Sequence, residues 1–240
     1  MAETEEAVVA SPTKKGVGAI VVAAGKSLRM GGGDKIWVSL GGRPLLAHTV
    51  SIFQFCSAID RVVLVLSADR QKLGMSLIKG AHFGKVAGIC FGGDERQQSV
   101  RAGLEALGPC EWVVVHDGAR PLVTTRLIEQ GLAAARETGA ATCAVPIHDT
   151  IKLVNDKHMV EKSLNRNHLW LIQTPQVFRY DLLMEAHRKA DGQPAAGDDA
   201  ALVERLGYPV KVFMGSYHNI KVTTPDDLVL AQMLLKWHRA

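Results

Sequence analysis

Two cations and a group of small residues follow the first apolar segment of the chain. Residues 18–23 are apolar and rich in β-branched side chains, which predicts a buried strand. The strand leads into Ala23–Gly25, whose small side chains allow backbone amides to approach a ligand closely. Arg29 and Lys35 then bring two positive charges to a glycine-rich loop. Free amides and cations together favour the binding of a polyphosphate.

Two common phosphate loops do not match this segment. Gly25 begins the Gly-Lys-Ser ending of a Walker A loop, but Ile20 stands where that loop needs its first glycine. The dinucleotide fingerprint also fails, because Ile36 stands where its third glycine would fall after Gly33. A flexible glycine loop with solvated charges is the alternative interpretation.

Acidic residues follow two further apolar runs. Asp94 comes after residues 86–90, and Asp117 comes after residues 112–115. Because the carboxyl ends of parallel strands meet at one edge of a sheet, we expect both to lie near Gly25. Asp117 could then coordinate Mg²⁺, which prefers one or two carboxylates together with phosphate oxygens. The alternative is an ion pair with Arg120 that only stiffens the turn.

Apolar strand-like runs alternate with segments of helical period, which predicts an α/β fold with a mostly parallel sheet between two helical layers, a Rossmann-like three-layer sandwich. The predicted strands are residues 18–23, 62–66, 86–90, 112–115, 141–145 and 209–213, and the predicted helices are residues 45–55, 97–107, 127–137 and 225–237.

Residues 148–167 interrupt this alternation. They are polar and contain two short β-prone pieces, 150–154 and 159–163, around the turn sequence Asn-Asp-Lys-His. This pattern predicts a two-stranded hairpin that stands off the main sheet. An isolated hairpin is only marginally stable in water, so we expect this arm to pack against something.

Composition narrows the function classes. A net charge of +4 on 240 residues fits a small anionic substrate and gives no argument for nucleic acid. The four cysteines form no Cys-x-x-Cys pair, and the nine histidines are dispersed, so a transition-metal site is not expected. Cys90 and Cys143 lie in apolar runs and are expected to be buried. No signal peptide or membrane span is predicted, which favours a cytoplasmic protein, with residues 1–15 as a disordered tail and 16–240 as a single domain.

Seven blocks in order resemble the 2-C-methyl-D-erythritol 4-phosphate cytidylyltransferase family of the non-mevalonate isoprenoid pathway. The blocks are AAGKSLRMG at 23–31, GGDERQQSV at 92–100, VHDGARP at 115–121, DTIK at 149–152, NRNHLW at 165–170, QTPQ at 173–176 and NIKVT at 219–223. The chain departs from the family pattern at Asp34, where proline is usual in a loop that is here one residue shorter. It departs again at Gly197, where threonine is frequent.

The resemblance implies a fold of the nucleotide-diphospho-sugar transferase type and a homodimer in which the arm reaches across to the partner. It also implies Mg²⁺ or another divalent cation, CTP and a polyol phosphate, with no nucleic acid or membrane partner. The implied site residues are Arg29, Lys35 and Lys221 for catalysis; Ala23, Ala24, Gly25, Gly93, Asp94 and Ser99 for the nucleotide; Asp117, Thr150, Arg166 and Thr174 for the second substrate; and Asp117 for the metal.

The resemblance implies cytidylyl transfer, in which a phosphate oxygen of the acceptor attacks the α-phosphorus of CTP. A phosphate monoester has a second pKa of about 6, so the nucleophile is already ionised near neutral pH and needs no general base. Ser99 has an alternative role in capping its own helix, and Arg166 could instead pair with Glu161. A cytidylyltransferase for another polyol phosphate, such as ribitol 5-phosphate, and a non-catalytic nucleotide-binding module remain the alternatives.

Overall fold

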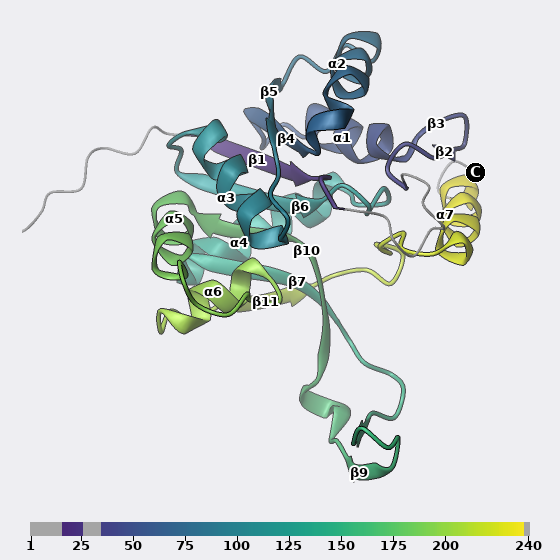
Figure 1. The fold of residues 1–240 in the computed structure, drawn as a ribbon, viewed down its shortest axis with the longest axis vertical. Helices are drawn as coiled ribbons and strands as arrows, with labels where there is room; N and C mark the ends of the chain where they lie inside the picture. Colours follow the sequence, from purple (N-terminus) through teal and green to yellow (C-terminus); the bar gives the residue numbers. More distant parts are fainter. Residues whose placement is uncertain (1–15, 26–34, 238–240) are drawn as a thin grey trace, which may run out of the picture.

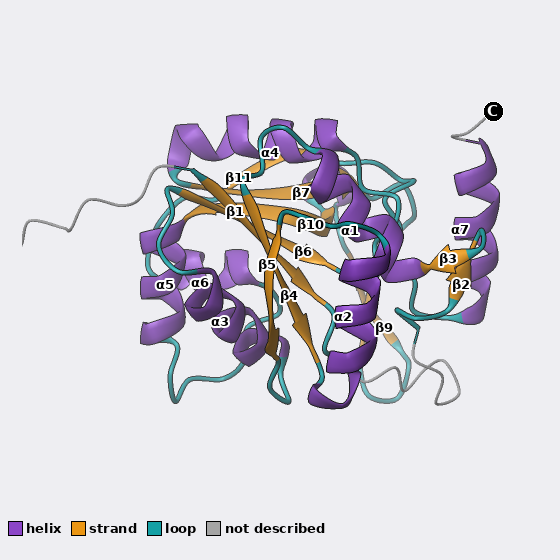
Figure 2. Ribbon diagram, turned by 90° about the horizontal axis from the view of Figure 1, so that it is seen from above, coloured by secondary structure: helices purple, strands orange, loops and turns teal. Residues whose placement is uncertain are grey.

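A seven-stranded, mostly parallel sheet forms the centre of the molecule (Figures 1 and 2). The structure is a computed structural model, and it describes residues 16–25 and 35–237. The strand order is β11-β7-β10-β6-β1-β4-β5. These strands are β1 (Val17–Val22), β4 (Arg61–Leu66), β5 (Val86–Phe91), β6 (Trp112–Asp117), β7 (Ala140–Pro146), β10 (Trp170–Arg179) and β11 (Lys211–Met214).

Helices cover both faces of this sheet (Figure 2). One apolar core joins the sheet to α1 (Leu45–Phe55), α2 (Gln71–Gly80) and α4 (Thr125–Thr138). The other joins it to α3 (Arg96–Leu107), α5 (Tyr180–Lys189) and α6 (Asp199–Arg205). The predicted three-layer α/β sandwich is therefore confirmed. α7 (Pro225–Trp237) packs beside the small sheet of β2 (Ser39–Leu40) and β3 (Arg43–Pro44).

β10 is a strand that the sequence pattern does not predict. It runs antiparallel to both of its neighbours, β6 and β7, and its pairing with β7 shifts register between Ile172 and Gln176. Pro175 lies inside that irregularity, where the strand can tolerate a residue without an amide hydrogen. The polar sequence around this proline breaks the apolar pattern of the strand, which explains the omission. All six predicted strands are present, with their ends shifted by one or two residues.

The predicted arm is present as a two-stranded antiparallel hairpin, β8 (Lys152–Val154) and β9 (Val160–Ser163). The side chain of Asn155 accepts hydrogen bonds from the amides of Lys157 and Met159, at 3.0 and 3.1 Å, and so closes the turn. A short 3₁₀ turn, η3 (Arg166–His168), follows, and β10 carries the chain back. The arm stands away from the body of the molecule (Figure 1).

Only one of the two cysteines that were expected to be buried is fully buried. Cys143 is buried as expected, but Cys90 is only half-buried, because it lies on β5 at the edge of the sheet. Another short 3₁₀ turn, η2 (Ala68–Arg70), precedes α2. Across the described residues, no helix is long and apolar enough to cross a membrane. Residues 1–15 lie outside the described part of the chain.

Candidate active site at the carboxyl ends of the strands

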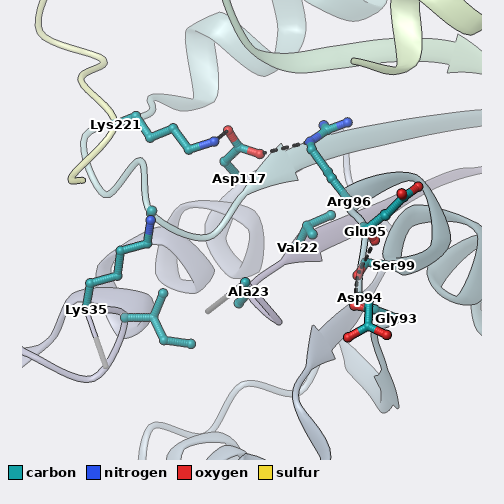
Figure 3. Close-up of a pocket in the computed structure, with 13 residues that line it drawn as sticks. Val22, Ala23, Lys35, Gly93, Asp94, Glu95, Arg96, Ser99, Asp117 and Lys221 are labelled. Carbon is teal, nitrogen blue, oxygen red and sulfur yellow. Dashed lines mark hydrogen bonds and ion pairs between the residues drawn. The ribbon is translucent and has the colours of Figure 1, made fainter. Parts of the chain in front are cut away.

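A cavity lies where β1, β5 and β6 end (Figure 3). The convergence predicted from the sequence is confirmed, since Gly25, Asp94 and Asp117 all line this cavity although they are far apart in the chain. Its lining is Val22, Ala23, Gly25, Lys35, Ile36, Gly93, Asp94, Glu95, Arg96, Ser99, Asp117, Ala119 and Lys221. Cations and carboxylates thus meet beside small residues, a surface that suits a phosphorylated ligand.

Asp117, the last residue of β6, is the electrostatic centre of the cavity. Its Oδ2 lies 2.8 Å from Lys221 Nζ, and its Oδ1 lies 3.5 Å from Arg96 Nε (Figure 3). Arg120 Nε is 3.7 Å from Oδ2. Burial alone would raise the pKa of this carboxyl, but Lys221, Arg96 and Arg120 together hold the pKa well below its usual range. Asp117 is therefore ionised at neutral pH.

The two interpretations of Asp117 are compatible with this geometry. The ion pair with Arg120 is present, and Arg120 also donates from Nη1 to the carbonyl oxygen of Asn219 at 2.7 Å, which fixes the turn. The described residues contain no cluster of three or more His, Cys, Asp or Glu side chains that could hold a metal alone. A single ionised carboxylate still fits Mg²⁺ when substrate phosphates supply the remaining ligands.

A hydrogen-bonded chain behind Asp117 fixes the end of β6. Burial lowers the pKa of His116 to about 4, so the imidazole is neutral at pH 7. Its Nε2 lies 3.3 Å from the carbonyl oxygen of Arg120 and must donate to it, which leaves Nδ1 as an acceptor for the Thr174 hydroxyl at 3.0 Å. Thr174 Oγ1 in turn accepts the amide hydrogen of Asp117 at 3.0 Å.

Three of the predicted nucleotide residues, Gly93, Asp94 and Ser99, lie around the start of α3 on the wall of the cavity that faces Lys35 and Lys221 (Figure 3). Ser99 is buried, and its hydroxyl donates to the carbonyl oxygen of Glu95 at 3.2 Å, so it bonds to the backbone of its own helix, although the cap itself is Glu95. A Cβ on Gly92 would come within 2.4 Å of Ala24 Cβ, so the turn before α3 requires a glycine there. Ala23 lines the cavity, whereas Ala24 packs behind it.

Arg96 is a cavity residue to which its motif in the sequence assigns no role. The structure shows that it lines the cavity and contacts two carboxylates, Asp117 and Asp199. Arg96 is the first residue of α3, and Glu95 caps that helix with Gln98 in a reciprocal capping box. A cation at a helix N-terminus interacts unfavourably with the helix dipole. An arginine in the first turn of a predicted helix is therefore a sequence signal that could have indicated a functional role for Arg96.

The arm carries two of the predicted site residues away from this cavity. Thr150 and Arg166 are exposed, and neither lines the cavity of its own chain. Arg166 donates from Nη1 to the carbonyl oxygen of His148, and this contact, not one with Glu161, holds its side chain. Lys35 does reach the cavity. Arg29, together with Lys26 and Asp34, lies outside the described residues.

Comparison with known proteins gives one consistent result. A family model described as 2-C-methyl-D-erythritol 4-phosphate cytidylyltransferase matches residues 17–237. A relative of that name from Dehalococcoides mccartyi is 51% identical over 220 residues, which cover 92% of this chain and 96% of the relative. Another of that name, from Alkaliphilus oremlandii, is 44% identical over 224 residues, covering 92% of this chain and 95% of the relative.

Solved structures agree with the sequence relatives. The 4-diphosphocytidyl-2C-methyl-D-erythritol synthase of Anaerococcus prevotii superimposes with a TM-score of 0.82 at 32% identity, covering 92% of this chain and 96% of that one. The 2-C-methyl-D-erythritol 4-phosphate cytidylyltransferase of Thermus thermophilus gives a TM-score of 0.75 at 36% identity, covering 90% of this chain and 98% of that one. The similarity therefore extends over nearly the whole of each chain.

Proposed function

The chain belongs to the 2-C-methyl-D-erythritol 4-phosphate cytidylyltransferase family, and we propose that the cavity at the ends of β1, β5 and β6 is where its reaction takes place. The enzyme transfers the cytidylyl group of CTP to 2-C-methyl-D-erythritol 4-phosphate in isoprenoid precursor biosynthesis. The products are 4-diphosphocytidyl-2-C-methyl-D-erythritol and pyrophosphate. The convergence of Lys35, Lys221 and Asp117 on one cavity is the observation that supports the location.

The chemistry at this cavity is in-line displacement without a general base. An oxygen of the acceptor phosphate forms the new bond to the α-phosphorus of CTP, while the bond from that phosphorus to the pyrophosphate oxygen breaks and pyrophosphate leaves. The acceptor phosphate, with a second pKa of about 6, is mostly a dianion at pH 7. His116 is buried and hydrogen bonded at both ring nitrogens, so its position does not suit proton transfer to a substrate.

Cations overcome the repulsion between the two anionic substrates. Lys35 and Lys221 come from distant parts of the chain and both line the cavity (Figure 3), where they would act as point charges on the phosphates. Arg29 is the further cation that the motif supplies. Lys221 is held at 2.8 Å by Asp117, which limits its motion before substrate arrives. Catalysis of this kind depends on positioning and on stabilising the charge of the leaving pyrophosphate.

Asp117 is the residue that would hold a divalent cation. It is ionised, it lines the cavity, and enzymes of this type commonly use such ions with phosphate oxygens as the other ligands. Mg²⁺, when bound, would neutralise charge on the phosphates. Thr174, which the sequence assigned to the second substrate, is buried behind Asp117, so its position supports a role in placing that carboxylate.

The base of CTP would lie against the wall formed by Ala23, Gly25, Gly93, Asp94 and Ser99, with Ala24 packed behind it. Small side chains and close backbone approach favour a pyrimidine over a larger purine. Main-chain carbonyl oxygens here could accept from the exocyclic amine of cytosine, which uracil lacks.

A homodimer would complete the site. Thr150 and Arg166 lie on the exposed arm, which points away from its own cavity, and this supports an arrangement in which each arm reaches the cavity of the partner subunit (Figure 1). Arg166 is a suitable ligand for the acceptor phosphate, because its guanidinium can grip two oxygens at once.

Pyrophosphate release with a panel of substrates tests this assignment. With a divalent cation, CTP and 2-C-methyl-D-erythritol 4-phosphate should give rapid release, while UTP and ATP should be poor donors. Ribitol 5-phosphate should be a poor acceptor. Comparable kcat/KM with ATP would refute the proposed base pocket, and comparable kcat/KM with ribitol 5-phosphate would refute the acceptor assignment.

A further inference from the structure

Arg96 lies between two carboxylates, and it contacts Asp199 more closely than it contacts Asp117 in the cavity. Its Nη1 donates to Asp199 Oδ2 at 2.6 Å, whereas its Nε lies 3.5 Å from Asp117 Oδ1. Arg96 and Asp199 are the first residues of α3 and α6, so this ion pair joins two helices that are distant in sequence. Figure 3 shows the Arg96 side chain extending from α3 to Asp117.

Asp199 is a buried carboxylate that does not line the cavity. It is only 1% exposed, and its Oδ1 lies 3.2 Å from Nε2 of His187, which is itself buried in α5. Because a carboxylate can only accept, Nε2 must carry the hydrogen of this bond. The amide of Asp199 donates to Gln176 Oε1 at 3.2 Å, which ties it to β10.

Because Asp199 is buried, its ionised form depends on the positive charge of Arg96. Burial alone would raise the pKa of the Asp199 carboxyl, but the Arg96 guanidinium and the hydrogen bond from His187 lower it, so the group is ionised. If Arg96 swung away, it would leave this buried negative charge without a cation, which is costly. Arg96 is therefore a fixed support for Asp117 and is not free to follow a substrate phosphate.

We propose that Asp199 and His187 are positioning residues for the reaction: they hold Arg96 beside Asp117, and Arg96 and Lys221 together set the orientation of the Asp117 carboxylate. Neither Asp199 nor His187 lines the cavity. The inference rests on the proposed role of Asp117 at the reaction site. The competing explanation is that Asp199 only stabilises the start of α6.

A double-mutant cycle separates the two explanations, with kcat/KM for CTP and the melting temperature measured for each protein. Asp199→Asn should lower kcat/KM by about tenfold or more in the parent. In the Arg96→Met background the same change should cost less than about twofold, because Asp199 acts only through Arg96. A role confined to the stability of α6 would lower the melting temperature and leave kcat/KM unchanged.

Asp191→Asn is the matched control. Asp191 also accepts from an arginine of α3, Arg101, at 2.6 Å, but this pair is exposed and does not line the cavity. Its loss should leave kcat/KM within about twofold of the parent, since surface ion pairs contribute little.

An equal fold-loss from Asp199→Asn in both backgrounds, or no loss in the parent, would overturn the inference. Asp117→Asn tests the premise on which the inference rests. Parent-like activity in that variant would refute the proposed role of Asp117 itself. If Asp199→Asn does not fold, His187→Gln replaces it. A loss of about threefold that disappears in Arg96→Met would support the proposal, and unchanged kcat/KM in the parent would overturn it.

Discussion

At the scale of single residues, the site depends on how one carboxylate is surrounded. Asp117 faces Lys221, Arg96 and Arg120, and its amide is held by Thr174. A lone buried carboxylate would be unfavourable, so the three cations are what allow it to stay ionised. The same contacts restrict its rotation, which prepares the cavity for anionic substrates before they bind.

The buried imidazole of His116 should make stability depend on pH. Its folded pKa is about 4, lowered by burial from 6.5, so the unfolded state binds more protons between these values. The His116 contribution to stability is complete above about pH 6.5 and is lost as the pH falls towards 4. Urea unfolding of the parent and of His116→Gln at several pH values should show a shallower decline in the variant over this range. Parallel curves would contradict the assignment.

Thr174 should contribute to stability through its hydroxyl. Thr174→Val keeps the shape but leaves the amide of Asp117 and Nδ1 of His116 without partners, which should reduce the free energy of unfolding by about 1–3 kcal/mol. Thr174→Ser keeps both hydrogen bonds and should cost less than about 1.5 kcal/mol. Denaturant unfolding measures both, and equal losses in the two variants would show that the hydroxyl is not the cause.

At the scale of elements, close packing of α3 on the sheet places Arg96 and Ser99 at the cavity. Gly103 lies on the face of α3 that meets β1 and β4, and a Cβ there would come within 2.5 Å of Ile20 Cγ2 and 3.0 Å of Val65 Cγ2. A larger side chain would therefore push the helix away from the strands. The glycine allows the close approach that sets the height of α3 above the sheet.

Gly103→Ala should destabilise the protein by about 1–3 kcal/mol, although alanine favours helices, because the added methyl group overpacks the interface. Gly80→Ala is the matched control, since Gly80 ends α2 and has nothing within 4 Å of an added Cβ. Melting curves should show a loss for the first variant and no loss for the second. A stabilised Gly103→Ala would contradict the packing argument.

The elements also show how far the sequence predicts the structure. Apolar runs such as residues 62–66 and the helical period of residues 45–55 identify their elements, because both patterns arise from burial against one core. β10 could not be found in this way, since Gln173 and Gln176 are buried polar residues whose partners come from distant parts of the chain. The contact between Arg96 and Asp199 is equally invisible, because it joins residues 103 positions apart.

At the scale of the whole molecule, the arm carries two residues expected to bind substrate away from the cavity of their own chain. The motifs place Thr150 and Arg166 in the site, yet the fold of one chain carries them outward on an exposed hairpin (Figure 1). Several apolar side chains at the arm and its base are also exposed, among them Met159, Val160 and Leu171. A second copy of the chain would both cover these side chains and complete the site.

Subunit mixing tests this account most directly. Lys35→Ala removes a cation from the cavity and Arg166→Ala removes the arm's guanidinium, so each protein alone should be nearly inactive. When the two exchange subunits at equal concentrations, about half of the dimers are mixed, and each mixed dimer regains one intact site of two. Activity should return to about a quarter of that of the parent on this symmetric model. Tagged chains confirm that exchange has occurred; with exchange confirmed, no recovery would show that Arg166 acts within its own chain and would contradict the shared site.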